Sequence, residues 1–358
     1  MKKIDTSGIE VLDLMIRKNK KISLIAHIRP DGDAIGSTLA MRGYLAARGC
    51  DAAVIYSDMV PETLAFLREG TPDGGIIEFP ADNDKAFRRI EVSDMIICQD
   101  CNSFARTGAL EESLRNAKAE KVLIDHHLAP DTTAFNLIFS ETEVSSACEL
   151  LFNILMSMPE IGGDATKLPA VTARALMTGM TTDTNNFKNS VFPSTLEMAS
   201  SLLAAGVDRD EIISRLYQSG RENSVRLWGY MLYENLKITS YGVAYNAETA
   251  KKFDLKEGET EGLVNEPLKI DNVRMSIFLK EDGDGFYRVS IRTKKGVSAV
   301  KCSASYFHGG GHENASGGRL FFKPVDGRPA DISAPEEAEK YIIDKTSVYF
   351  EDGSYESR

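Results

Sequence analysis

Residues 22–49 read ISLIAHIRPDGDAIGSTLAMRGYLAARG and decide the fold of the first half of the chain. The segment begins with a short apolar run, ISLIAH, which is typical of a buried strand. It continues through a polar turn into a helical pattern over residues 34–49, which ends at a glycine as helices often do. We therefore expect a strand followed directly by a helix, with His27, Asp31 and Asp33 at the junction.

Three further apolar runs repeat this arrangement along the chain. They lie at residues 52–56, 94–100 and 121–127, and amphipathic stretches separate them. Alternation of strands and helices predicts a parallel sheet with helices on both faces. We therefore assign residues 1–190 to a doubly wound α/β domain, which also contains helices at about 144–159 and 167–180.

The sequence pattern changes at about residue 237. Segments at 236–246, 273–281 and 286–293 alternate apolar and polar residues, as half-exposed strands do. A helical pattern at 297–307, a glycine cluster and a strand pattern at 319–324 follow. We predict a smaller α/β domain with a mixed sheet at 237–350, a helical linker at 191–236, and a substrate cleft between the two domains.

Composition excludes several classes of protein. The 358 residues are 42% hydrophobic and 27% charged, which is typical of a soluble globular protein. No apolar run has the length of a signal peptide core or a membrane span, so we expect a cytoplasmic protein without a membrane partner. Five cysteines are too few for a disulfide framework. The net charge of −11 disfavours long duplex nucleic acid as a partner.

The histidines and a set of aspartates gather at strand ends. His27 follows the first strand, Asp100 ends the third, and Asp125-His126-His127 end the fourth. The carboxyl ends of the strands of a doubly wound sheet share one edge, where ligands bind. Asp31, Asp33 and Asp183 follow strand or helix patterns in the same half of the chain. Asp31 or Asp183 taken alone is better explained as a helix cap or turn residue, but the whole set is not.

Imidazoles and carboxylates without thiolates favour hard or borderline divalent ions. We expect Mn²⁺, with Mg²⁺ as the alternative. Two histidines and at least four aspartates exceed what one ion needs. Two ions roughly 3.5–4 Å apart, bridged by a shared carboxylate, would use all of them and would suit phosphoryl transfer.

The second half of the chain offers donors for an anion rather than metal ligands. The cluster Gly309-Gly310-Gly311-His312 lies about 20 residues after Arg292. Glycines let backbone N–H groups approach a phosphate, and arginine can bind phosphate through two hydrogen bonds. We therefore assign this cluster and Arg292 to substrate binding. The alternative is a flexible glycine loop beside a solvated basic strand.

Together these motifs resemble the DHH phosphoesterases, a family named for the triplet present here as Asp125-His126-His127. The segment from His27 to Ser37 resembles the first motif of the family, Asp100 the second and Asp183 the fourth. GGGHENASGG (309–318) resembles the signature of the DHH-associated C-terminal domain. Within the family, the chain is similar to the bifunctional oligoribonucleases that also act as 3′-phosphoadenosine 5′-phosphate phosphatases.

The resemblance implies a role for each residue of the set. One ion would be held by His27, Asp31 and Asp100. The other would be held by Asp33, Asp100, His126 and Asp183, with Asp100 as the bridge. His127, Asp33 and Asp100 would act in catalysis, and Asp125 would anchor His126. Arg292, Gly309, Gly310, Gly311 and His312 would bind the terminal phosphate or nucleotide.

The favoured hypothesis is a two-metal enzyme that hydrolyses short single-stranded RNA (nanoRNA) to mononucleotides and the adenosine bisphosphate to AMP. The sequence also allows an enzyme for linear or cyclic dinucleotides, and it leaves a homodimer open. A pyrophosphatase is disfavoured by the glycine-rich domain, since pyrophosphate has no base or sugar to bind. A non-catalytic nucleotide sensor is disfavoured because it would not need a complete set of metal ligands.

Overall fold

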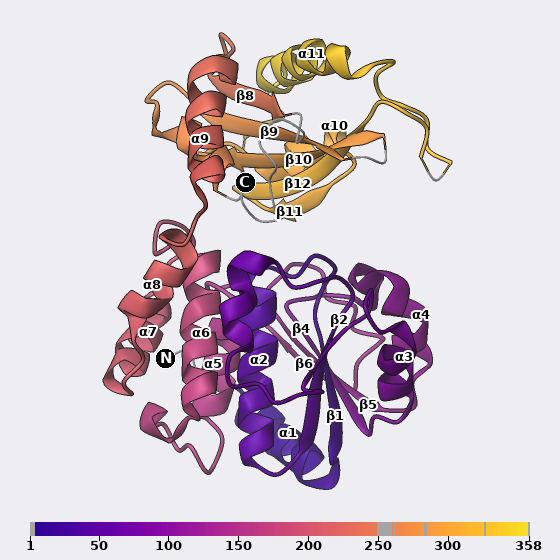
Figure 1. Cartoon of the computed structure of the whole chain (residues 1–358), viewed down its shortest axis with the longest axis vertical. Helices are drawn as coiled ribbons and strands as arrows, with labels where there is room; N and C mark the ends of the chain where they lie inside the picture. Colours follow the sequence, from indigo (N-terminus) through magenta and orange to yellow (C-terminus); the bar gives the residue numbers. More distant parts are fainter. Residues whose placement is uncertain (1–3, 249–259, 261, 283–284, 326, 357–358) are drawn as a thin grey trace. The chain divides into compact units, whose positions relative to one another are not determined.

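The computed structural model describes residues 4–248, 260, 262–282, 285–325 and 327–356. The chain divides into two compact units, Met1–Ser219 and Gly220–Arg358. The first unit contains a six-stranded parallel sheet in the order β3-β2-β1-β4-β5-β6 (Figure 1). Its strands are β1 (Lys21–Ile25), β2 (Asp51–Tyr56), β3 (Ile76–Glu78), β4 (Met95–Gln99), β5 (Glu120–Asp125) and β6 (Leu137–Ser140).

Strand β1 lies at the centre of this sheet. Ile22 pairs with Ala52 of β2 on one side and with Met95 of β4 on the other. Strands β1 to β3 extend the sheet toward one edge, whereas β4 to β6 extend it from β1 toward the other edge. The carboxyl ends of β1 and β4 therefore flank the point where ligands bind in such folds. The predicted doubly wound parallel sheet is confirmed.

Helices cover both faces of this sheet. Leu24 of β1 belongs to a core formed with α1, α2, α5 and α6, whereas the next residue, Ile25, belongs to a core formed with α3 and α4. This alternation follows from side chains that point to opposite faces of a strand. The helices of the unit are α1 (Thr6–Lys18), α2 (Gly32–Ala47), α3 (Asn83–Glu91), α4 (Glu111–Asn116), α5 (Ala147–Met156), α6 (Ala170–Asp183), α7 (Pro193–Ala204) and α8 (Arg209–Tyr217).

Helices α2 and α6 pack unusually closely because glycines face each other. A Cβ on Gly36 of α2 would lie 3.0 Å from Cα of Gly179 on α6, which is too close for a side chain. The close approach matters for function because α2 begins at Asp31 and α6 ends at Asp183. The packing of two glycines therefore fixes two candidate site residues relative to each other.

The second unit contains a six-stranded mixed sheet in the order β11-β12-β10-β9-β8-β7. Strands β8 and β9 are parallel, and the other neighbours are antiparallel. Helices α10 and α11 share a core with one face of the sheet. The elements are α9 (Glu222–Tyr230), β7 (Lys237–Ile238), β8 (Val243–Glu248), β9 (Met275–Asp282), β10 (Phe286–Thr293), α10 (Ala299–Tyr306), β11 (Gly310–His312), β12 (Ala315–Phe321) and α11 (Ala338–Glu351).

Two predicted segments differ from their expected form. The glycine cluster is not a loop, because Gly310–His312 form a strand that pairs with Ala315–Gly317 of β12. The predicted linker at 191–236 is helical, but its residues enter two cores. Met198, Leu202 and Ile212 pack in the first unit, and Leu227 and Met231 pack in the second. The predicted domain boundaries themselves stay a prediction.

None of the helices among the described residues has both the length and the apolar character needed to cross a bilayer. All five cysteines are buried and free. Cys98 lies in β4 and Cys101 just beyond it.

Candidate metal centre

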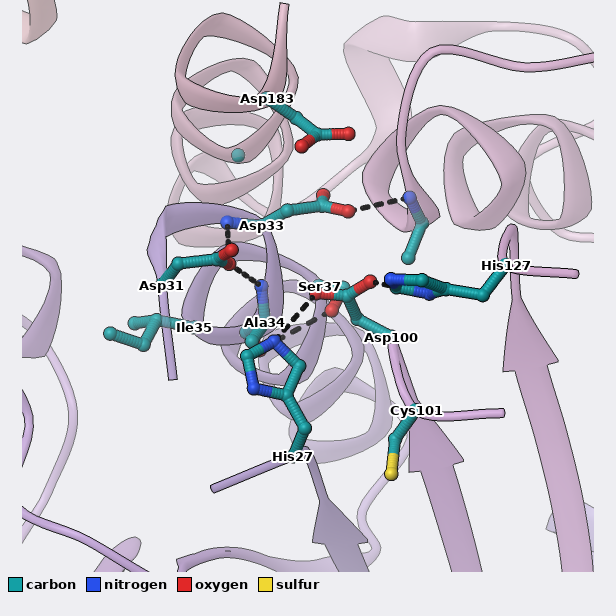
Figure 2. A network of polar contacts seen from close by, with 12 residues as sticks. His27, Asp31, Asp33, Ala34, Ile35, Ser37, Asp100, Cys101, His127 and Asp183 are labelled. Atoms are coloured by element: carbon teal, nitrogen blue, oxygen red, sulfur yellow. Dashed lines mark hydrogen bonds and ion pairs between the residues drawn. The ribbon is translucent and has the colours of Figure 1, made fainter. Parts of the chain in front are cut away.

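The site residues lie at the carboxyl edge of the first sheet. His27 follows β1, Asp100 follows β4, and His126 follows β5 directly. Because these strands are neighbours in the sheet, residues far apart in the sequence meet there. Figure 2 shows the side chains of His27, Asp33, Asp100 and Asp183 gathered around the start of α2.

The imidazole of His27 is oriented by the backbone. Its Nδ1 lies 2.7 Å from the carbonyl oxygen of Ile28, which can only accept a hydrogen bond, so Nδ1 carries the proton. The other nitrogen, Nε2, lies 3.3 Å from Oδ2 of Asp100. A backbone contact of this kind is the usual way to direct the second nitrogen of a histidine toward a metal.

Asp31 and Asp33 are also held by backbone N–H groups. Asp31 caps α2 and accepts hydrogen bonds from the amides of Asp33 and Ala34 at 3.0 and 3.1 Å. The buried carboxylate of Asp33 lies at the start of α5, where it accepts from the amides of Ala147 and Cys148 at 2.6 and 2.9 Å. The N-terminus of a helix stabilises a negative charge, so α5 supports Asp33 in its ionised form.

Asp100 lies between the histidines. Its Oδ2 contacts His27, and its Oδ1 lies 3.4 Å from Nε2 of His126. Oδ1 is buried and makes no hydrogen bond to any residue that the structure describes. The backbone of Asp100 has a φ of 51°, a left-handed conformation that is uncommon for a residue other than glycine. A buried oxygen that has imidazole nitrogens nearby but no hydrogen bond to a described residue, on a left-handed backbone, fits a metal ligand.

His126 reaches the remaining carboxylates of the set. Its Nε2 lies 3.6 Å from Oδ2 of Asp183 and 3.8 Å from Oδ2 of Asp33. The structure thus brings together all six residues that the sequence proposed as metal ligands. Among the described residues, His27, Asp31 and Asp100 place ligand atoms within 4.8 Å of one another, and so do Asp33, Asp100 and His126.

Asp125 contacts His127 through both of its oxygens, whereas the resemblance implied that it anchors His126. Oδ1 lies 2.9 Å from Nδ1 of His127, and Oδ2 accepts from the backbone amide of His127 at 3.0 Å. Asp125 is the last residue of β5, and the turn that follows brings the ring two residues later back over its carboxylate.

The charges of the cluster shift its pKa values strongly. Burial opposes the charge on both histidines, but contacts with Asp100 outweigh it and raise the pKa of His27 to about 9 and of His126 to about 10. Burial and the charge of Asp100 raise the pKa of Asp33 to about 7. Burial also raises the pKa of Asp183, whereas the two histidines hold the pKa of Asp100 well below its usual range despite its burial.

These shifts describe a cluster of carboxylates that needs positive charge. Without a cation, protons on His27 and His126 neutralise the aspartates. A divalent ion would replace those protons, because histidine binds a metal only when it is neutral. The donor set therefore fits divalent ions, and Asp100 belongs to both groups of candidate ligands.

A strained turn follows Asp183. Asn185, Asn186 and Phe187 have φ values of 46°, 56° and 63°, three consecutive left-handed residues without a glycine. Arg209, the first residue of α8, donates to the side chain of Asn186 and lies 5.5 Å over the ring of Phe187. Sequence analysis missed Arg209, since nothing in the local sequence links α8 to this turn.

Sequence analysis also missed the start of α5 as a support for Asp33. A signal was present, because Ser146 and Glu149 have the spacing of a capping box, which marks the start of a helix. In the structure, Ser146 caps α5 and accepts from the amide of Glu149 at 3.0 Å. The contact with Asp33 itself spans more than 100 residues and leaves no trace in the local sequence.

The predicted substrate-binding residues lie together in the second unit. Arg292 on β10 is opposite Ala315 on β12, which is opposite His312 on β11. Nη1 of Arg292 donates to the carbonyl oxygens of Ile291 and Ser316 at 2.9 and 3.4 Å. Gly309 and Gly311 leave no room for a side chain, because the backbone of β12 lies against them. These two glycines therefore have a packing role whether or not they bind an anion.

Two family models and a solved structure match this chain. Residues 21–180 match the model of the DHH family, N-terminal domain, and residues 239–321 match the DHHA1 domain. A solved structure of an exopolyphosphatase-related protein from Bacteroides fragilis is 31% identical, with a TM-score of 0.86 over 98% of both chains.

Two curated relatives have more specific names. The chain is 27% identical to the probable bifunctional oligoribonuclease and PAP phosphatase NrnA of Streptococcus mutans, covering 86% of this chain and 91% of that protein. It is 24% identical to the cyclic-di-AMP phosphodiesterase GdpP of Geobacillus thermodenitrificans, covering 95% of this chain but only 49% of that protein.

Proposed function

The chain belongs to the DHH family, and from this premise we propose that it hydrolyses short oligoribonucleotides to mononucleotides and 3′-phosphoadenosine 5′-phosphate to AMP. Membership of the family makes it a metal-dependent hydrolase. The observation that carries the proposal is the cluster of six ligands around Asp100 at the carboxyl edge of the sheet.

Each residue of the cluster has a proposed role. His27, Asp31 and Asp100 would hold one divalent ion, and Asp33, Asp100, His126 and Asp183 would hold the other. Two such ions, Mn²⁺ in our proposal, would supply positive charge for the phosphoryl oxygens. Asp33 and Asp100 would act in catalysis as ligands of these ions.

The contact between Asp125 and His127 supports a role in proton transfer. The carboxylate of Asp125 holds the ring of His127 through Nδ1. In this proposal His127 donates a proton to the oxygen that leaves the phosphate. Asp125 acts through His127, as a residue that orients it.

Residues of the second unit bind the substrate in this proposal. Arg292 and His312 contact the terminal phosphate, and the backbone of Gly309, Gly310 and Gly311 lies beside it. The groups are hydrogen-bond donors, which suit phosphate and make a poor metal site. The acidic charge of the whole chain restricts the substrate to small anions or short single strands.

A cyclic dinucleotide phosphodiesterase is the second candidate, because relatives with that activity in their names match 95% of this chain. The oligoribonuclease is favoured because the chain spans 91% of the relative with that name but only about half of the cyclic-di-AMP phosphodiesterase. A non-catalytic sensor stays the alternative of another class. The complete set of ligands counts against it.

The proposal is tested by turnover with Mn²⁺ on a panel of substrates. The panel consists of a dinucleotide, a pentanucleotide, 3′-phosphoadenosine 5′-phosphate, a cyclic dinucleotide and pyrophosphate. We expect the first three to be hydrolysed most efficiently. Preference for the cyclic dinucleotide would favour the second candidate, and no turnover of any substrate would favour the sensor.

A further inference from the structure

Three basic residues form a row across the sheet of the second unit. Lys280 of β9 is directly opposite Arg288 of β10, and Arg288 is directly opposite Arg319 of β12. All three side chains are half-buried. Cross-strand neighbours have Cβ atoms roughly 4.5–5.5 Å apart, so the three basic side chains can act on one phosphate or on neighbouring phosphates of one ligand.

The basic row lies on the same face of the sheet as Arg292 and His312. Tyr287, Val289 and Ile291 of β10 enter the core formed with α10 and α11. Side chains alternate along a strand, so Arg288 and Arg292 point to the opposite face. The pairing of Arg292 with Ala315, and of Ala315 with His312, extends that face to β11. Figure 1 shows these strands side by side.

Small residues separate the basic row from Arg292 and His312. Ser290 of β10 is opposite Gly317 of β12, which is opposite Gly310 of β11, and both glycines are exposed. A Cβ on Gly310 would meet no atom within 4 Å, and one on Gly317 would meet only the carbonyl oxygen of Val289, at 3.6 Å. Neither glycine has a positive φ. Packing and backbone conformation therefore leave both glycines unexplained, whereas close approach of a ligand explains them.

The geometry suits an extended ligand with several charges. Arg288 and Arg292 are four residues apart on one strand, which places them roughly 13 Å apart. The guanidinium carbon of Arg319 lies 5.0 Å from the centre of the Phe286 ring, and Phe286 is 4% exposed. A guanidinium held on an aromatic ring loses less freedom when it binds an anion.

We propose that Lys280, Arg288 and Arg319 form a second phosphate-binding site for single-stranded RNA. The RNA runs over Gly310 and Gly317. Its terminal phosphate lies at Arg292 and His312, and its following phosphates lie at the basic row. This inference rests on the proposed function. The basic row would let the protein distinguish longer RNA substrates from shorter ones. A pentanucleotide reaches the row, whereas 3′-phosphoadenosine 5′-phosphate is too short to span both sets of residues.

The test measures binding of RNA separately from its cleavage. Lys280→Gln and Arg319→Gln each remove one charge from the row. Lys340→Gln removes one from α11, which packs on the other face of the sheet, and serves as the matched control. Binding of a fluorescent pentanucleotide is followed by anisotropy in EDTA over a range of salt concentrations. Thermal unfolding checks that each variant is folded.

We expect each row variant to raise the Kd of the pentanucleotide by roughly two- to fivefold at low salt. The slope of log Kd against log salt should fall by about 0.7 for each lost phosphate contact. Binding of 3′-phosphoadenosine 5′-phosphate, measured by competition, should not change. An unchanged Kd for the pentanucleotide in both row variants overturns the proposal, and so does equal weakening of both ligands.

The proposed function is judged by a different measurement, turnover of the pentanucleotide by the unmodified chain with Mn²⁺. Turnover with unchanged binding in the row variants would reject the second site and keep the ribonuclease. Weakened binding without any turnover would keep the site as an RNA-binding surface and reject the ribonuclease.

Discussion

The carboxylate of Asp125 makes two contacts with His127, one with the ring nitrogen Nδ1 and one with the backbone amide. The carboxylate is fully buried and contacts Nδ1 of the ring, so it fixes the position of the imidazole. This pair yields a prediction about catalysis that does not involve the metal ligands.

Replacing Asp125 with Asn should lower kcat by roughly 10–100-fold, because His127 loses the carboxylate that orients its ring. KM and Mn²⁺ affinity should change little. His127→Gln should have an effect of similar size, and the double variant should lose little more, since the two residues act as one unit. Steady-state kinetics of the four proteins test this. Independent, additive losses would show that Asp125 does not act through His127.

In the proposed function Asp100 would bridge the two ions, which makes it the most sensitive of the proposed ligands. Asp100→Asn keeps a residue that tolerates the positive φ but removes the charge shared by both groups of ligands. We expect turnover to fall by more than the ~10–100-fold loss typical of an outer contact. Asp94→Asn, at the other end of β4, is the control and should stay active. An Asp100→Asn variant with a tenth of normal turnover would exclude a bridging role.

Metal binding should depend on pH with a definite sign. The raised pKa values of His27 and His126, about 9 and 10, mean that their bound protons stabilise the metal-free fold fully below about pH 6.5. This stabilisation is lost as the pH rises through 9–10. The pKa of Asp33 is raised to about 7, so its bound proton also stabilises the metal-free fold. This stabilisation is lost between about pH 4 and 7.

Mn²⁺ must displace these protons, so its affinity and the rise in Tm that it causes should both be larger at pH 8.5 than at pH 6.5. Calorimetry in buffers of different ionisation enthalpy should detect proton release on binding. Binding without proton release at pH 7 would contradict the protonated state assigned to the histidines.

The glycine contact between α2 and α6 predicts a link between packing and metal binding. A Cβ on Gly179 would lie 3.1 Å from Cα of Asp33 and would collide with the thiol of Cys148. Gly179→Ala should destabilise the fold by about 1–3 kcal/mol and weaken Mn²⁺ binding, since Asp33 must move. Gly229→Ala, in α9 with no atom near its Cβ, should instead stabilise by about 0.4–1 kcal/mol. Thermal unfolding and Mn²⁺ titration distinguish the two.

Arg292→Ala should raise KM and leave Mn²⁺ affinity unchanged, because Arg292 binds phosphate in the proposed function and no metal. A buried, bidentate contact would cost about 2–5 kcal/mol of binding. His312→Ala is measured beside it, with Lys340→Ala as the control. Normal kinetics in both site variants would leave only the packing role of the glycine-rich strand.

The sequence predicts most of the first unit because its long strands are buried on both faces and appear as apolar runs. It does not reveal β3 and β6, which have three and four residues and lie at the sheet edges. The strand at Gly310–His312 is also hidden, because glycine has low strand propensity and the pairing with β12 decides its conformation.

The candidate ligand set was accessible from sequence because each residue lies near the end or the start of an element whose pattern is clear. The supporting contacts were not, since they depend on chain segments that meet only in the fold. Arg209 contacts a turn 22 to 23 residues earlier, and the amide of Ala147 meets Asp33 across 114 residues.

The way in which three ligands are oriented has a consequence for evolution. His27 is held by a carbonyl oxygen, and Asp31 and Asp33 are held by amide nitrogens. Backbone groups are present whatever the side chain, so substitutions of the neighbouring residues leave these contacts available. The geometry of the centre can therefore be inherited through long sequence drift, and libraries that randomise Ile28, Ala34 or Ala147 should retain many active members as long as packing is preserved.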